Sequence, residues 1–119
     1  MVIMVSMKPL EQSEAEYAMD HGEFSPKIIE SNENVVIVLT QGWCPQWAAL
    51  KHMLAKLDFP NLNVFTFIYD RSPIFTEFMQ FKESTYHNHE VPYLRYYKGG
   101  KLINTSNSVW KRRFLKNLN

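Results

Sequence analysis

The sequence has little of what several classes of protein depend on. Its 119 residues include a single cysteine, Cys44, so neither an intramolecular disulfide nor a four-cysteine zinc site can form. Lysines and arginines number 13 against 12 acidic residues, and a net charge of +1 provides no broad field for nucleic acid or an anionic membrane. No apolar run approaches the roughly 20 residues of a membrane-spanning helix. With 45% hydrophobic residues, the chain has the composition of a folded globular protein.

The length is typical of one domain, residues 1–119, within which the role of residues 1–24 as an N-terminal extension is left open. Residues 1–7 are apolar, but they lack the basic stretch and the small-residue cleavage site of a secretory signal. The unpaired thiol suits a reducing compartment. We therefore expect a cytoplasmic protein, a monomer or weak dimer, with neither nucleic acid nor membrane as a partner.

The central part of the chain predicts a parallel strand–helix–strand unit. Residues 35–39 form an unbroken apolar run rich in β-branched side chains, typical of a strand buried on both faces. A helix is expected over residues 46–57, because Trp47, Leu50, Leu54 and Leu57 share one face. Residues 62–69 then indicate a second strand, and the connection is long enough for a helical crossover.

The flanking segments complete an α/β pattern with a central mixed sheet flanked by helices. Ser72 and Pro73 predict the N-cap and first position of a helix. Strands at 93–97 and 101–104 are joined by Gly99-Gly100, a hairpin signal, and Trp110, Phe114 and Leu118 predict one face of a final helix. In the first part of the chain we expect an edge strand in residues 1–6 and helices at 11–19 and 25–31.

Two short motifs give these elements a family resemblance. Trp43-Cys44-Pro45 follows the first central strand and opens a helix, and Val91-Pro92 precedes a later strand. From about residue 25 to residue 118, the chain resembles the thioredoxin-like superfamily of thioredoxins and glutaredoxins. The resemblance implies a thioredoxin fold with a cis-proline before the third core strand. It also implies Cys44 as the catalytic nucleophile, and substrate contacts from Trp43, Pro45, Trp47, Val91 and Pro92.

The motif departs from the family at two positions that serve the same step. Trp47 stands where a thioredoxin has its second cysteine, and Val38 stands at the position of the family's buried aspartate. In the family, the second thiol attacks the mixed disulfide and the aspartate assists it. With both groups absent, no residue of the motif can release Cys44 from a mixed disulfide.

The first half of such an exchange remains chemically available. Cys44 is expected at a helix N-terminus, where free N–H groups and the helix dipole favour the thiolate. The thiolate is the attacking species in thiol–disulfide exchange.

Three functions stay open at this stage. The first is a monothiol thiol–disulfide oxidoreductase, which forms mixed disulfides with glutathione or a partner thiol and has no cofactor beyond glutathione as a co-substrate. The second is a non-catalytic module that binds a protein or peptide around Trp43, Trp47 and Val91. The third is metal or iron–sulfur ligation by Cys44 with a thiol from outside the chain.

Two features admit plainer interpretations. His87 and His89 have metal-ligand side chains, but nothing in the sequence brings them to Cys44, so a solvated loop and no metal site are expected. Trp47 lies on the same predicted helix face as Leu50 and Leu54, which favours a place in the core over a contact with substrate.

Overall fold

The structure, a computed structural model, describes residues 5–119 and consists of five strands, five α-helices and a 3₁₀ helix. In chain order these are β1 (Ser6–Pro9), α1 (Gln12–His21), α2 (Pro26–Ile29), β2 (Asn34–Thr40), α3 (Pro45–Ala55), β3 (Leu62–Ile68), the 3₁₀ helix η1 (Tyr69–Arg71), α4 (Phe75–Thr85), β4 (Tyr93–Lys98), β5 (Lys101–Ser106) and α5 (Lys111–Asn117). None of the helices in the described part of the chain is both long and apolar enough to cross a membrane.

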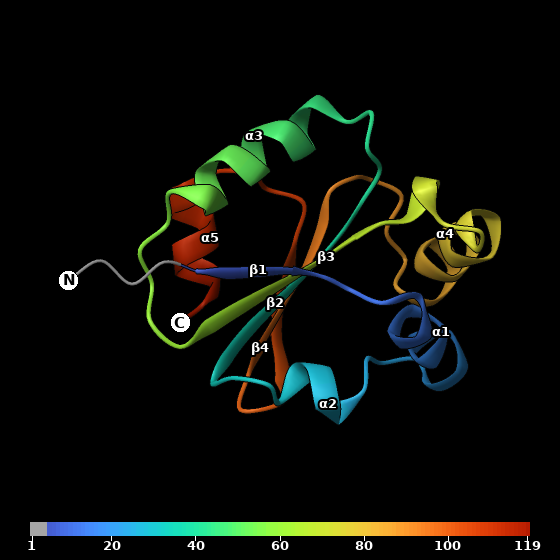
Figure 1. Ribbon diagram of the computed structural model, residues 1–119, viewed down its shortest axis with the longest axis horizontal. Helices are drawn as coiled ribbons and strands as arrows, with labels where there is room; N and C mark the ends of the chain where they lie inside the picture. The colour runs from blue at the N-terminus through green and yellow to red at the C-terminus, as the bar shows by residue number, and fades with distance from the viewer. Residues whose placement is uncertain (1–4) are drawn as a thin grey trace.

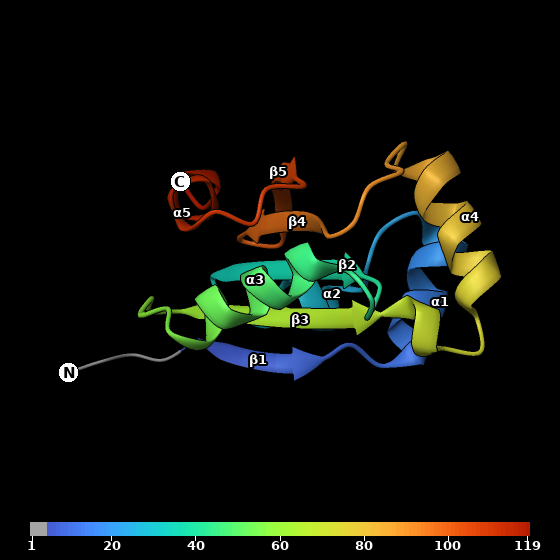
Figure 2. The same ribbon diagram turned by 90° about the horizontal axis from the view of Figure 1, so that it is seen from above.

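The strands form one mixed sheet with the order β1-β3-β2-β4-β5. β2 and β3 pair in parallel, and α3 connects them, which confirms the predicted strand–helix–strand unit. β4 runs antiparallel to β2, and β5 antiparallel to β4. Viewed from above, β1 and β3 both point toward α1 and α4 (Figure 2).

Strand β2 lies at the centre of the sheet and is buried along its whole length. Because side chains alternate along a strand, Val35, Ile37 and Leu39 face one side while Val36 and Val38 face the other. The first side packs against α1, α2 and α4, and the second against α3 and α5 (Figure 1). The continuous apolar run of this segment therefore supplies two cores.

The N-terminal segment contributes to the first of these cores. Leu10, Ala15, Ala18 and Phe24 are all buried there. The helix expected over residues 11–19 is α1, and the short helix expected from Ser25 is α2. An edge strand is observed at Ser6–Pro9, and residues 1–4 of the segment in which it was expected lie outside the described part of the chain.

The predicted start of the fourth helix was wrong by two residues. Ser72 and Pro73 belong to a turn, in which the Ile74 amide donates to Ser72 Oγ (3.3 Å) and the Phe75 amide to the Ser72 carbonyl (3.1 Å). The first helical bond runs from the Phe78 amide to the Ile74 carbonyl (2.8 Å), so α4 begins at Phe75. Ser72 therefore caps the turn before the helix and not the helix itself.

The C-terminal elements agree with prediction except at Trp110. Gly99 and Gly100 both have positive φ angles, 59° and 78°, as a tight hairpin between β4 and β5 requires. Phe114 and Leu118 are buried, but Trp110 is 73% exposed. Trp110 is the N-cap of α5 and has an extended backbone, so its side chain does not continue the helix face. The prediction that it lines that face was wrong.

Candidate functional site

Cys44 lies where the central strand β2 gives way to helix α3. It is the N-cap of α3, with an extended backbone, and Pro45 occupies the first helical turn, where its missing N–H costs nothing. The Cys44 carbonyl accepts the first helical hydrogen bonds, from the amides of Trp47 (3.1 Å) and Ala48 (3.3 Å). The thiol is therefore held at the positive end of an eleven-residue helix.

The thiol meets a loop from a distant part of the chain. Cys44 Sγ lies 3.5 Å from the carbonyl oxygen of Val91, and it donates a weak hydrogen bond to it. The Val91–Pro92 peptide bond is cis, as predicted, and β4 begins directly after it at Tyr93. The motif at residues 43–45 and the motif at residues 91–92 are thus joined at one point on the sheet.

A groove with a volume of about 320 Å³ opens beside this point. Of the six site residues named from the sequence, Trp43, Cys44, Pro45 and Val91 line it, and Trp47 and Pro92 do not. The remaining lining residues are Gln41, Gln46, Tyr69, Glu83, His89 and Glu90. Cys44 itself is only 4% exposed, so it forms part of the groove's wall and does not project from it.

The two tryptophans of the motif have opposite environments. Trp43 is 67% exposed, and its indole N–H donates to Gln41 Oε1. Trp47 is 6% exposed and belongs to the same core cluster as Val38 and Cys44. Trp47, at the position of the family's second cysteine, is therefore a core side chain. Val38, at the position of the family's buried aspartate, is an aliphatic one.

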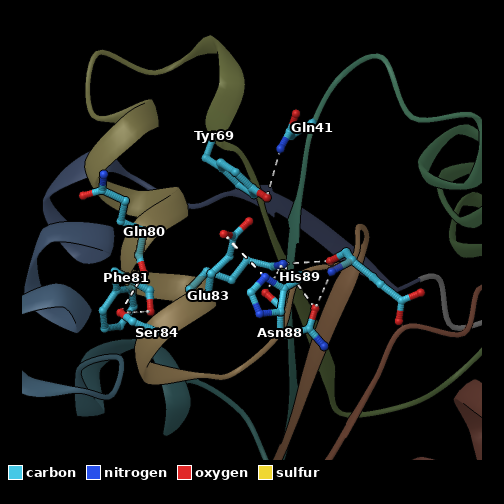
Figure 3. A network of polar contacts seen from close by, with 10 residues as sticks. Gln41, Tyr69, Gln80, Phe81, Glu83, Ser84, Asn88 and His89 are labelled. Carbon is cyan, nitrogen blue, oxygen red and sulfur yellow. Dashed lines mark hydrogen bonds and ion pairs between the residues drawn. The ribbon is translucent and has the colours of Figure 1, made fainter.

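None of the remaining groove-lining residues was predicted as a site residue from the sequence, and two polar pairs form among them. Gln41 Nε2 donates to the Tyr69 hydroxyl at 3.2 Å, and His89 Nδ1 lies 3.5 Å from Glu83 Oε1; Figure 3 shows both pairs. Gln41 and Tyr69 follow the carboxyl ends of the parallel strands β2 and β3, so the strand prediction could have brought them together. No comparable signal points to Glu83.

The turn before Cys44 is braced by the segment after β3. The Gly42 amide donates to Asp70 Oδ1 at 2.9 Å. The Arg71 guanidinium lies against Gly42, where a Cβ atom would be 2.5 Å from Nη2. A glycine at this position lets the guanidinium approach the backbone of the turn.

The pKa of Tyr69 depends on the charges around the groove. Burial is the largest cause that raises its pKa above the usual 10.0, and the negative charges of Glu83, Asp70 and a Cys44 thiolate act in the same direction, against the hydrogen bond from Gln41. The phenol therefore keeps its proton at neutral pH. The Glu83 carboxylate and a Cys44 thiolate are therefore both close enough to the Tyr69 hydroxyl to affect its pKa.

A buried lysine fastens the loop that carries Val91. Lys82 of α4 is 1% exposed, and its Nζ donates to the carbonyls of Asn88 (2.9 Å) and Glu90 (2.7 Å) and to Asn88 Oδ1 (3.2 Å). Burial lowers the pKa of Lys82 from 10.5 to about 8, opposed by the carboxylates of Glu83 and Glu90. From the other side, Asn107 Nδ2 donates to the Pro92 carbonyl at 2.9 Å. The loop is therefore held from both α4 and the segment after β5.

Metal ligands do not gather at this site. Within residues 5–119, no three histidine, cysteine, aspartate or glutamate side chains lie close enough together to hold a metal ion. His89 lines the groove as the partner of Glu83 and is not placed as a ligand beside Cys44 and His87.

Comparison with solved structures places this arrangement among known folds. Thioredoxin O1 from Arabidopsis thaliana superposes with a TM-score of 0.66 at 19% identity, covering 95% of this chain and 94% of that one. Thioredoxin from Malassezia sympodialis gives 0.64 at 16% identity, with coverages of 99% and 92%. Mitochondrial thioredoxin 3 from Saccharomyces cerevisiae gives 0.62 at 18% identity, with coverages of 98% and 92%.

No protein-family model and no curated protein matches the sequence. At these identities, the structural matches establish the architecture and leave the chemistry to the residues of this chain. The matches extend over nearly all of each chain, and the shared features include the mixed sheet and its flanking helices. The chain therefore has the thioredoxin fold, with a single cysteine at the start of α3.

Proposed function

We propose that this protein is a monothiol thiol–disulfide oxidoreductase, in which Cys44 forms a mixed disulfide with glutathione or with a partner thiol. The observation that supports the proposal is the position of Cys44 Sγ. The sulfur lies at the N-terminus of α3, in the wall of a groove, 3.5 Å from the Val91 carbonyl of the cis-proline loop. The positive end of the α3 dipole acts on the sulfur there, and the backbone edge at Val91 can align an extended segment.

The proposed exchange has two steps, each of which breaks one S–S bond and forms another. In the first, the Cys44 thiolate attacks one sulfur of a disulfide, and the other sulfur leaves with the bonding electrons and takes up a proton. Cys44 and the captured sulfur are then joined, and the departing sulfur has been reduced. In the second, an external thiolate attacks the captured sulfur and releases the Cys44 thiolate.

The second thiol has to come from outside the chain. Cys44 is the single cysteine of the sequence, and Trp47 fills the place of a resolving cysteine in the core. Turnover is therefore expected to rise in proportion to the concentration of an added thiol. For the same reason, the protein should reduce insulin disulfides poorly when thioredoxin reductase is the sole electron source.

Mass spectrometry of the intact protein tests the proposal. The wild type is incubated with oxidised glutathione, and we expect one glutathione adduct at Cys44 that a second thiol removes. Cys44→Ser is the control and should carry no adduct. If the folded wild type remains unmodified under conditions in which the urea-unfolded chain is modified, the thiol is unreactive in the native state and the proposal is wrong.

A second function is favoured by the burial of the thiol. Cys44 is 4% exposed, and Val38 and Trp47 in the same cluster are apolar, while Trp43 stands 67% exposed beside the groove. A domain with these features can bind an extended protein segment without covalent chemistry. Under that alternative, Cys44→Ser keeps full affinity for a captured partner, whereas the monothiol mechanism predicts that the partner is lost with the sulfur.

A further inference from the structure

The charged side chains that line the groove beside Cys44 are two carboxylates and one imidazole, and the His89 imidazole lies 3.5 Å from Glu83 Oε1. Its charged lining consists of Glu83, Glu90 and the titratable His89, and none of the described residues that line it is a lysine or an arginine. The Glu83 side chain is 38% exposed, and Glu90 is exposed, so both carboxylates can act on a bound partner. A ligand in this groove meets negative charge close to the sulfur.

Two cations close to the groove contact the protein itself and do not line the groove. Lys82 is buried, and its three hydrogen bonds go to the oxygens of Asn88 and Glu90. Arg71 lies against Gly42 and is not part of the lining. The groove therefore offers carboxylates to a ligand, while the neighbouring ammonium and guanidinium groups stabilise the loops around it.

Glutathione fits this lining poorly. The tripeptide carries two carboxylates and one ammonium group, so its net charge is negative and it is repelled by Glu83 and Glu90. A peptide with lysine or arginine beside its cysteine has the complementary charge. The exposed indole of Trp43 adds a face on which such a cation can stack.

Resting on the proposed function, we infer that the partner captured by Cys44 is a cationic protein segment, a cysteine flanked by lysine or arginine, in preference to glutathione. Glu83 and Glu90 are the residues that determine this specificity. Carboxylates at a partly exposed binding surface act mainly on the rate of association, and salt screens their effect.

A set of matched disulfides tests the inference. Three substrates carry thionitrobenzoate on the cysteine sulfur: a peptide with lysines beside the cysteine, the same peptide with glutamates, and glutathione. The Cys44 thiolate attacks the peptide sulfur, the bond to thionitrobenzoate breaks, and the coloured thionitrobenzoate leaves with the electron pair. Each second-order rate is divided by the rate with free 2-mercaptoethanol, which corrects for the intrinsic reactivity of each disulfide.

We expect the wild type to react about fivefold faster with the lysine peptide than with the glutamate peptide or glutathione at low salt. The ratio should fall toward one in Glu83→Gln/Glu90→Gln and in about 0.5 M salt. Glu16→Gln/Glu77→Gln, which removes two exposed acids outside the groove lining, is the charge-matched control and should keep the wild-type ratio.

The possible failures are distinguishable. Equal normalised rates for the three substrates, or a preference that survives in Glu83→Gln/Glu90→Gln, would overturn the inference while leaving Cys44 as a working nucleophile. An absence of reaction between wild type and every substrate, with 2-mercaptoethanol reacting normally, would overturn the proposed function and the inference together.

Discussion

At the scale of single residues, Trp43 and Trp47 carry the same side chain in opposite surroundings. Trp43 precedes α3 and is 67% exposed, and Trp47 lies in the first turn of the helix and is 6% exposed. The indole of Trp47 fills volume in the core that also contains Val38 and Cys44, so the space that a resolving cysteine would use is closed by packing. The two indoles therefore have different consequences for stability and for binding.

Alanine substitutions at these positions should separate the two roles. Trp47→Ala should lower the free energy of unfolding by about 3–5 kcal/mol, because it leaves a large cavity in the core. Trp43→Ala should change it by less than about 0.5 kcal/mol and instead slow reaction with the lysine peptide. Urea unfolding monitored by circular dichroism measures the free energy of unfolding of both variants. A large loss of stability in Trp43→Ala would contradict the assignment.

At the scale of elements, the connection between α4 and β4 is held by polar contacts from two sides. Lys82 reaches it from α4, and Asn107 from the segment after β5. Asn88 joins the two, since its Nδ2 donates to Asn107 Oδ1 (2.9 Å) and its Oδ1 accepts from Lys82 Nζ (3.2 Å). The position of the Val91 carbonyl opposite Cys44 therefore depends on a buried amine as well as on the proline.

The lysine predicts a pH dependence of stability. Burial lowers the pKa of Lys82 in the folded protein to about 8, against 10.5 for a lysine in water, so the unfolded chain binds the proton more tightly. The contribution of Lys82 to stability therefore rises as the pH increases from 8 toward 10.5, and this gain is lost as the pH falls back to 8. The stability difference between wild type and Lys82→Met should shift in favour of wild type by about 2 kcal/mol from pH 7 to pH 9.5.

Urea unfolding of both proteins across this pH range measures the difference. Lys51→Met removes an exposed lysine from α3. The stability difference between wild type and Lys51→Met should change little across this pH range, because that amine is in contact with water in both the folded and the unfolded chain. If the stability difference between wild type and Lys82→Met is equally independent of pH, burial of the amine carries no energetic penalty.

At the scale of the whole molecule, an ion pair between a buried arginine and a partly exposed glutamate connects the N-terminal segment to the sheet. Arg95 of β4 is 5% exposed, and its Nη2 lies 2.9 Å from Oε1 of Glu23, which follows α1. The guanidinium also donates to the hydroxyls of Tyr97 (2.9 Å) and Tyr93 (3.1 Å) and stacks on Tyr86, 3.8 Å from the ring centroid. Residues far apart in the sequence are thus joined in the core that holds α4.

Removal of both partners should cost less than the sum of the two single removals. Glu23→Ala leaves the Arg95 charge without its carboxylate, and we expect a loss of about 2–4 kcal/mol in the free energy of unfolding. Glu23→Ala/Arg95→Met should lose less than the sum of the two single variants, as a double-mutant cycle measures. Glu16→Ala, an exposed acid on α1, is the control. Additive losses would show that the pair is not coupled.

Local sequence patterns determined most of the architecture. The apolar run of β2, the two glycines of the hairpin and the proline after Val91 each restrict the backbone in a way that nearby residues do not override. Together with the family resemblance, they were sufficient to predict the strand–helix–strand unit, the hairpin and the cis bond. The predicted helix start at Ser72 failed because capping residues also stabilise turns, and a sequence does not show which of the two follows.

Which residues line the groove depends on the tertiary structure. Cys44 and Val91 could be paired through a family motif, but Glu83 comes from a helix whose rotation about its axis is set by the burial of Phe78 and Phe81. Lys82 is buried because loop carbonyls surround its amine, and no spacing in the sequence indicates that. Backbone propensities act over a few residues and can be read locally, whereas the charges around the thiol depend on contacts that exist only after the layers have packed.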